Sequence, residues 1–357
     1  MTRPTPPDFE PLGELRCHDA PPGREPGPAL ALFRGFGAEF VLVPGGEVEL
    51  GWTEPRRSVY AGMPAHVVAG IEADLFGIRH PLEGHRRWLA DAEASPDTDP
   101  MLLAWLRDRV AVLAAEPDAD PELADAFTLD AYGARLAQNL SPARRAEIGP
   151  MLVERVPRPI GRRRLGTYDD ATGEHTLDAE HARQALAAIE RLGPIEGNGS
   201  ARLVGVVELR RRPSGDLEVF WEEETTHPEL VDALAADGFA LPTEDEWEYL
   251  CGGGSRTLFR WGDADPGDTT YGYGSEPDVL IEPNRMGVQI AWDQFKQEVT
   301  ADPALAKGGD GGGSLHDDVG WFHQTVPLST FHRSWADPRL GENLATGYYV
   351  HRRIVRL

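Results

Sequence analysis

The chain has 357 residues, of which 41% are hydrophobic and 26% charged, and its formal net charge at pH 7 is -24. This length is enough to bury a large core in one elaborate domain or in two, and the composition is that of a soluble globular protein. Because so acidic a surface repels phosphate groups, neither nucleic acid nor an anionic membrane is expected as a partner.

Residues 1–35 are rich in proline and are expected to form an extended, partly ordered arm. They lack the basic start and apolar run of a signal peptide, and the sequence has no apolar run of about 18 residues that would span a membrane. A cytoplasmic protein is the default expectation. The two cysteines, Cys17 and Cys251, are too few for a disulfide scaffold.

Arginine supplies nearly all of the positive charge. Of the 35 basic residues only Lys296 and Lys307 are lysine, and alanine, glycine and proline are abundant. This bias indicates a bacterial genome of high GC content, and on its own it says little about chemistry.

The first half of the chain changes texture at about residue 65. Residues 36–52 alternate apolar and polar around Pro44-Gly45-Gly46, which predicts a β-hairpin. Beyond residue 65 the apolar residues recur at helical spacing, broken by turns with proline and aspartate, so residues 65–198 are expected to form a mostly helical insertion. The helices expected within it cover residues 80–93, 99–115, 121–139, 141–153 and 178–192.

Two further segments lie between this insertion and the C-terminal part. Residues 155–164 carry five arginines and taken alone suggest phosphate binding, but in so acidic a chain these arginines are expected to pair with neighbouring carboxylates. Residues 202–210 and 217–222 flank Pro213-Ser-Gly-Asp216 and predict a second hairpin.

The sequence LPTEDEWEY, residues 241–249, predicts a helix with marked ends. Thr243 is a good N-cap residue, and Glu246, three residues later, completes a capping box. Glycines 252–254 predict the end of the helix, since glycine adopts left-handed conformations at little cost.

This helix and the FRWGD sequence at residues 259–263 together resemble the signature of the formylglycine-generating enzyme, or sulfatase-modifying factor, family. Phe40–Gly51 is similar to the opening hairpin of that family, and Gly347–Arg356 is similar to its closing strand. Two shorter segments between them, Pro283–Gly287 and Gly308–Ser314, also fall in the family's order. The resemblance covers residues 36–60 and 225–357.

The resemblance implies an α+β fold, namely a formylglycine-generating-enzyme-like (C-type-lectin-like) domain formed by residues 36–64 and 199–357 and interrupted by the insertion at residues 65–198. It also implies that the family's reaction is missing. That reaction requires two cysteines near the C-terminus that bind copper as thiolates, and the matching segment, residues 325–335, contains none. Cys17 and Cys251 match neither position.

A second branch of the same fold binds iron through a His-x3-His-x-Glu motif in a helical bundle. The nearest pair here is His80 and His85, with Pro81 between them. Five residues along a helix place two side chains about 140° apart, which does not suit one metal ion. These histidines are therefore expected to be surface or capping residues.

The remaining candidate site lies after the glycine-rich loop at residues 308–314, where converging backbone N–H groups favour a ligand. The candidate ligand-binding residues are Asp310, His316, Asp317, Trp321, His323 and His332. His316 and His323 are also candidate ligands of a transition metal, and Asp263 and Asp265 of calcium. Metal identity stays open.

Three functions remain open. The favoured one is a non-catalytic module that binds a small molecule, a peptide or a protein. The alternative is a metal-dependent enzyme of oxidoreductase type that uses the histidine and aspartate cluster. In the third, the helical insertion docks a partner protein.

Overall fold

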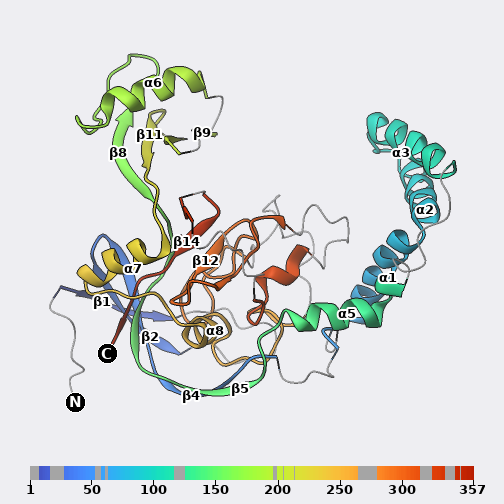
Figure 1. Ribbon diagram of the computed structural model, residues 1–357, viewed down its shortest axis with the longest axis horizontal. Coiled ribbons are helices and arrows are strands. Elements are labelled where there is room, and N and C mark those ends of the chain that lie inside the picture. The colour runs from blue at the N-terminus through green and yellow to red at the C-terminus, as the bar shows by residue number, and fades with distance from the viewer. Residues whose placement is uncertain are drawn as a thin grey trace.

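The computed structural model describes residues 8–16, 28–52, 58–60, 63–115, 125–195, 199–203, 205–212, 214–263, 280–313, 324–333, 342–345 and 347–357. The fold is of the α+β class. Figure 1 shows a central body of strands and helices from which a lobe and a helical arm project. No helix in these ranges has the length and apolar character needed to cross a membrane.

A five-stranded antiparallel sheet forms the centre of the body, in the order β1-β2-β3-β6-β15. Its strands are β1 (Glu10–Arg16), β2 (Ala29–Gly35), β3 (Ala38–Val43), β6 (Met151–Glu154) and β15 (Ile354–Arg356). Both faces of the sheet are covered. On one face Val41 and Val153 pack with Trp247, and on the other Phe40 and Leu152 pack with Leu230.

This sheet corrects two predictions from the sequence. Residues 1–35 do not form a simple arm, because β1 and β2 lie within them and pair with the rest of the sheet. The helix predicted over residues 141–153 is also wrong, since β5 (Arg144–Ile148) and β6 occupy that segment. All four residues of β6 are buried, Glu154 included, so the strand shows no alternation of buried and exposed positions to reveal it.

Two smaller sheets complete the body. A four-stranded sheet has the order β13-β12-β14-β7, in which β12 and β14 run parallel, and β4 (Gly46–Leu50) pairs with β5 in a separate ribbon. The four strands are β7 (Arg158–Pro159), β12 (Gln297–Val299), β13 (Ala306–Lys307) and β14 (Tyr349–His351).

Helix α8 (Glu244–Gly252) begins and ends where the sequence predicts. Thr243 caps it, and the Thr243 backbone N–H donates to Glu246 Oε2 at 2.7 Å to close the capping box. Gly253 ends it with a φ of 58°, in the left-handed region. Helix α7 (His227–Ala236) has a capping box of the same kind, formed by Thr226 and Glu229.

The lobe has a core of its own. Its sheet has the order β8-β11-β10-β9, and α6 (Ala182–Leu192) lies against it (Figure 1). The strands are β8 (Arg162–Tyr168), β9 (Ser200–Leu203), β10 (Val207–Arg211) and β11 (Leu217–Glu222). The predicted hairpin is present as β10 and β11, but the first predicted strand is divided into β9 and β10 by a turn closed by Val206 N–H and Leu203 O.

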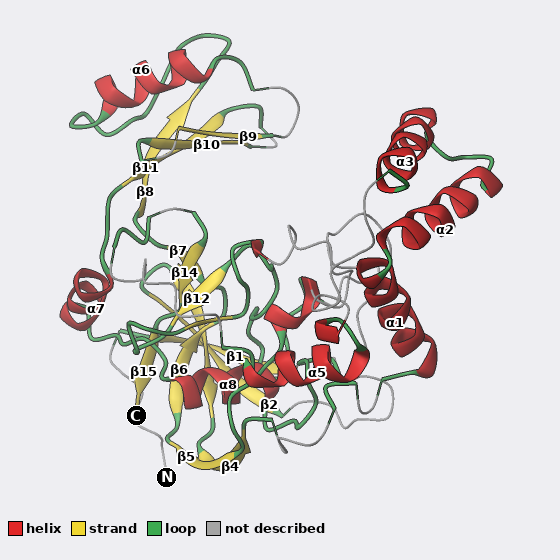
Figure 2. Ribbon diagram, turned by 45° about the vertical axis from the view of Figure 1, so that its right-hand side comes forward, coloured by secondary structure: helices red, strands yellow, loops and turns green. Residues whose placement is uncertain are grey.

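The helical arm comprises α1 (Ala65–Arg79), α2 (Pro81–Ala94) and α3 (Pro100–Leu113), and α5 (Leu129–Gln138) joins it to the body (Figure 2). Leu75 of α1 and Leu136 of α5 share a core cluster with Trp52 and Phe331 of the body. Among the described residues of the segment predicted as mostly helical, the main helices are α1, α2, α3, α5 and α6. The rest supplies β5 to β8.

Candidate functional site

Most of the residues proposed from the sequence as ligands lie outside the described part of the chain, namely Asp265, His316, Asp317, Trp321 and His323. Asp263, Asp310 and His332 are described. The metal-dependent hypothesis therefore stays a prediction.

The three described candidates lie in different surroundings. Asp263 Oδ1 accepts a hydrogen bond from the Leu258 N–H at 2.8 Å, and Asp310 Oδ1 accepts one from the Gly312 N–H at 2.9 Å. Both carboxylates thus stabilise their own loops. His332 is 4% exposed, and its backbone bridges to Leu140.

One group of side chains in the described ranges has the spacing of metal ligands, and it lies in the lobe. It consists of Asp178, Glu180 and His181. Arg163 already contacts two of them, since its Nη1 donates to Asp178 Oδ2 at 3.0 Å and its Nη2 lies 2.9 Å from His181 Nδ1. A guanidinium in that position opposes the binding of a cation.

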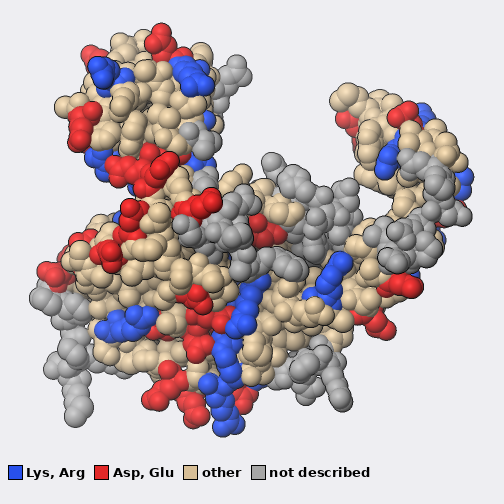
Figure 3. Space-filling view, viewed as in Figure 1, with Lys and Arg blue, Asp and Glu red and all other residues tan. Residues whose placement is uncertain are grey.

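The basic patch pairs with carboxylates, as the sequence predicts. Ion pairs join Arg155 to Glu39, Arg158 to Glu154, Arg162 to Glu208, Arg163 to Asp178 and Arg164 to Glu218. Figure 3 shows the same mixing on one whole face, where acidic and basic side chains lie interspersed over the lobe and the body.

The signature helix α8 is also held by ion pairs. Glu246 binds Arg356 through both carboxylate oxygens at 2.7 Å, and Glu244 binds Arg333 in the same way at 2.7 Å. Glu248 accepts from Lys307 Nζ at 2.7 Å. These acids connect α8 to distant segments, so their role is structural.

Cys251, also on α8, does not have the surroundings of a reactive thiol. It is 1% exposed, and its Sγ lies 3.7 Å from Thr330 Oγ1. Burial raises the pKa of the Cys251 thiol to about 11, so the thiol is protonated at neutral pH.

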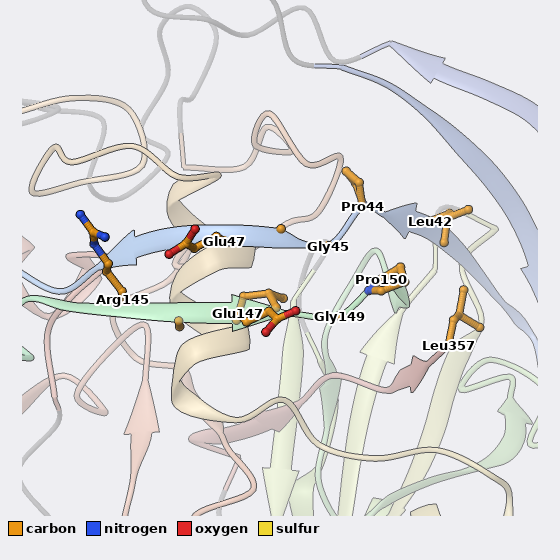
Figure 4. A pocket seen from close by; sticks show the side chains of 12 residues that line it. Leu42, Pro44, Gly45, Glu47, Arg145, Glu147, Gly149, Pro150 and Leu357 are labelled. Atoms are coloured by element: carbon orange, nitrogen blue, oxygen red, sulfur yellow. The ribbon is translucent and has the colours of Figure 1, made fainter.

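A hollow on the body beside the β4–β5 ribbon is a poor candidate for a binding site. It has a volume of about 990 Å³ and lies along the β4–β5 ribbon (Figure 4). Its charged side chains, Glu47, Arg145 and Glu147, are exposed along the ribbon, and much of its wall is glycine and proline. No set of buried polar groups converges on it.

A smaller cleft at the base of the lobe has the character of a binding site. It has a volume of about 360 Å³, and strands of both the lobe and the body contribute to its walls. Figure 2 shows β8 and β11 of the lobe running down toward β7 and β14 of the body. We call this cleft the lobe–body cleft, and its walls comprise Val156, Pro157, Pro159, Ile160, Arg162, Ser200, Ala201, Arg202, Glu208, Arg210, Glu222, Gln289, Trp292, Lys296, Ala345, Gly347 and Val350.

The charged groups of the cleft leave an excess of positive charge. Four cationic side chains and two carboxylates line it, in a chain whose net charge is -24. Glu222 pairs with Arg202. Glu208 forms ion pairs with Arg162 at 3.1 Å and with Arg210 at 2.7 Å. The fourth cation is Lys296.

Lys296 has no carboxylate partner among the described residues. Its Nζ donates to the Gly347 carbonyl oxygen at 2.6 Å and forms no ion pair with a described carboxylate, although Asp293 and Glu208 lie near enough to interact with it electrostatically. Burial lowers the pKa of Lys296 below its ordinary value. The remaining donors of a half-buried ammonium on the cleft wall therefore favour an external anion.

The apolar wall of the cleft includes the half-buried Trp292. Ala291, the residue before it, has a φ of 46° and is 2% exposed. A left-handed backbone at an alanine costs on the order of 1 kcal/mol and is concentrated at functional positions. The strained turn thus sets the position of an aromatic side chain beside the cations.

Sequence reasoning missed this cleft because its residues come from five separate stretches of the chain. The one available signal was Lys296 itself, a lysine in a chain that otherwise uses arginine.

No family model, curated protein or solved structure matches the chain. The resemblance to the formylglycine-generating enzyme family accordingly rests on the motifs alone.

Proposed function

We propose that this protein is a ligand-binding module that holds a small anionic molecule in the lobe–body cleft. The observation that carries the proposal is the half-buried ammonium of Lys296, which lines the cleft and has no carboxylate partner in the described part of the chain. The neighbouring arginines add a second source of charge-assisted hydrogen bonds.

The size of the cleft limits the ligand. A volume of about 360 Å³ lies near the lower end of the roughly 300–1,000 Å³ typical of small-molecule sites. Trp292 and the prolines give the ligand an apolar surface, while the cations bind its charge. A carboxylate or phosphate on a compact organic body fits both requirements, whereas an extended polymer does not.

We also propose that the body is a divergent sulfatase-modifying-factor fold without formylglycine-generating activity. The order of the motifs supports the fold, and the buried, protonated Cys251 supports the loss of the reaction. Ligand binding on such a scaffold is a property of its site and does not follow from its fold.

Calorimetric titration with small carboxylates and phosphate esters tests the proposal. Loss of a charge-assisted hydrogen bond in Lys296→Met is expected to weaken binding by about tenfold or more. Arg86→Met, which removes a half-exposed cation on α2, is the matched control and is expected to leave affinity unchanged. Equal affinities for Lys296→Met and the unmodified protein would refute the site.

A further inference from the structure

We infer that Lys296 forms a reversible imine with small aldehydes or ketones that carry a carboxylate or phosphate, such as 2-oxo acids. The inference rests on the proposed anion binding and adds a covalent step at the same site. It depends on three features, namely the identity of residue 296, its surroundings and the cations beside it.

The first feature is that residue 296 is a lysine, whose side chain ends in a primary amine. Arginine occupies every basic position of this chain except 296 and 307. At position 307 a lysine fits where the larger arginine would not, because the side chain is fully buried between Glu248 and the ring of Trp247. Lys296 is half-buried beside an open cleft that already accommodates three guanidinium groups, so space does not require a lysine there.

The second feature is the protonation state, since only the neutral amine attacks a carbonyl carbon. Burial disfavours the charged form of Lys296 and lowers its pKa, and the charges of Arg202 and Arg210 act in the same direction. Asp293 and Glu208 oppose them without reversing the shift. An arginine in this place would stay charged and unreactive.

The third feature is the means of holding a carbonyl compound close to Nζ. Guanidinium groups carry several N–H donors and bind carboxylates and phosphates. Arg202 and Arg210 line the same cleft as Lys296, where each also binds one carboxylate of the wall, Glu222 and Glu208 respectively. A 2-oxo acid held by its carboxylate presents its carbonyl carbon next to that group. Binding thus converts a bimolecular attack into an intramolecular one.

The chemical step balances without a further reactant. The Nζ lone pair forms a C–N bond to the carbonyl carbon, and the carbonyl oxygen takes up a proton to give a carbinolamine. The C–O bond then breaks, the oxygen leaves as water with a second proton, and the nitrogen retains one hydrogen as a protonated imine. The reverse addition of water releases the ligand unchanged.

Reductive trapping tests the inference, using pyruvate, glyoxylate and 2-oxoglutarate with cyanoborohydride, followed by peptide mass mapping. We expect an adduct on Lys296 and none on Lys307, with Lys296→Arg losing the adduct and Arg86→Met retaining it. A synthetic peptide of residues 291–300, which contains the same lysine, gives the intrinsic rate. Lys296 in the folded protein is expected to react at least about tenfold faster than the peptide. Acetone, which lacks the carboxylate, is expected to lose this advantage.

The outcomes separate this inference from the proposed function. An oxo acid that binds in calorimetry without forming an adduct refutes the imine and leaves anion binding intact. The imine is likewise refuted if Lys296 reacts with all three acids no faster than the peptide does. Absence of both binding and adduct, for these acids and for the other carboxylates and phosphate esters, overturns the two proposals together.

Discussion

The ion pair between Lys307 and Glu248 is expected to determine much of the stability of the body. Both side chains are 0% exposed, and Lys307 Nζ lies 2.7 Å from Glu248 Oε1 and 3.4 Å from Glu244 Oε1. Lys307→Met keeps most of the volume but removes the charge. Among the described cations, Glu248 then retains only Arg144, whose Nη2 lies 3.1 Å away without the geometry of a hydrogen bond.

Removing one partner of a buried pair leaves an uncompensated charge and costs about 3–5 kcal/mol. Arg144 reduces this cost, so we expect Lys307→Met to lose about 3 kcal/mol of unfolding free energy. This loss is measured by urea unfolding followed by both tryptophan fluorescence and circular dichroism. The measurement is valid when the two probes give the same transition and the m-value equals that of the unmodified protein. Arg107→Met is the control, because the Arg107–Glu93 pair at 2.8 Å is 61% and 45% exposed and is expected to contribute less than about 1 kcal/mol.

A double substitution isolates the pair from other effects. Lys307→Met combined with Glu248→Gln removes both charges, so its cost is expected to be smaller than the sum of the two single costs. A Lys307→Met cost below about 1 kcal/mol, or simple additivity within about 0.5 kcal/mol, would contradict the electrostatic account.

Three further outcomes are expected. Burial alone would raise the pKa of Glu244, but the hydrogen bond from Arg333 and the nearby cations outweigh it and lower the pKa to about 2. The ionised carboxylate therefore stabilises the fold above about pH 4.5, and this stabilisation is lost as the pH falls toward 2. Glu244→Gln should reduce the pH dependence of the unfolding free energy, measured in acid unfolding curves, by up to about 3 kcal/mol. Cys251→Ser should leave ligand binding unchanged in calorimetry, and in a Cys17→Ser background native Cys251 should resist iodoacetamide at pH 8; rapid alkylation of folded protein would disprove its burial. Gly347 has a φ of 83°, and a Cβ at that position would lie 2.0 Å from Arg202 Nη1. Gly347→Ala should therefore displace the Arg202 guanidinium and weaken anion binding. An unchanged affinity would exclude Arg202 as a contact of the anion.

The elements that could be predicted from the sequence are those with local signals. The capped helix α8 and the β10–β11 pair each carry a capping or turn residue at a defined spacing. The hairpin predicted around Pro44-Gly45-Gly46 is wrong, because β3 pairs with β2 and β6 whereas β4 pairs with β5 in a separate ribbon. Strand β6 carries none, because burial on both faces removes the alternation that identifies a strand. Strands β1 and β2 were obscured by the prolines around them.

The lobe–body cleft could not be predicted for a different reason. Arg162, Arg202 and Arg210 lie on strands of the lobe, and they meet Lys296 only where the lobe joins the body. No spacing along the chain encodes that meeting. The histidine and aspartate candidates were proposed because they are close in sequence, yet the described ones, Asp263, Asp310 and His332, have separate local partners.

The two lysines have different roles in the molecule. Lys307 neutralises Glu248 of helix α8 in a fully buried position, so it belongs to the scaffold of the body. Lys296 borders a cleft made partly by the lobe, which lies outside the segments that carry the resemblance. A reaction or ligand acquired at that boundary leaves the motif unchanged, because no residue of the motif lines the cleft except at the C-terminal strand. The function of this protein is therefore to be tested at the base of the lobe, and the signature helix is the place to test its stability.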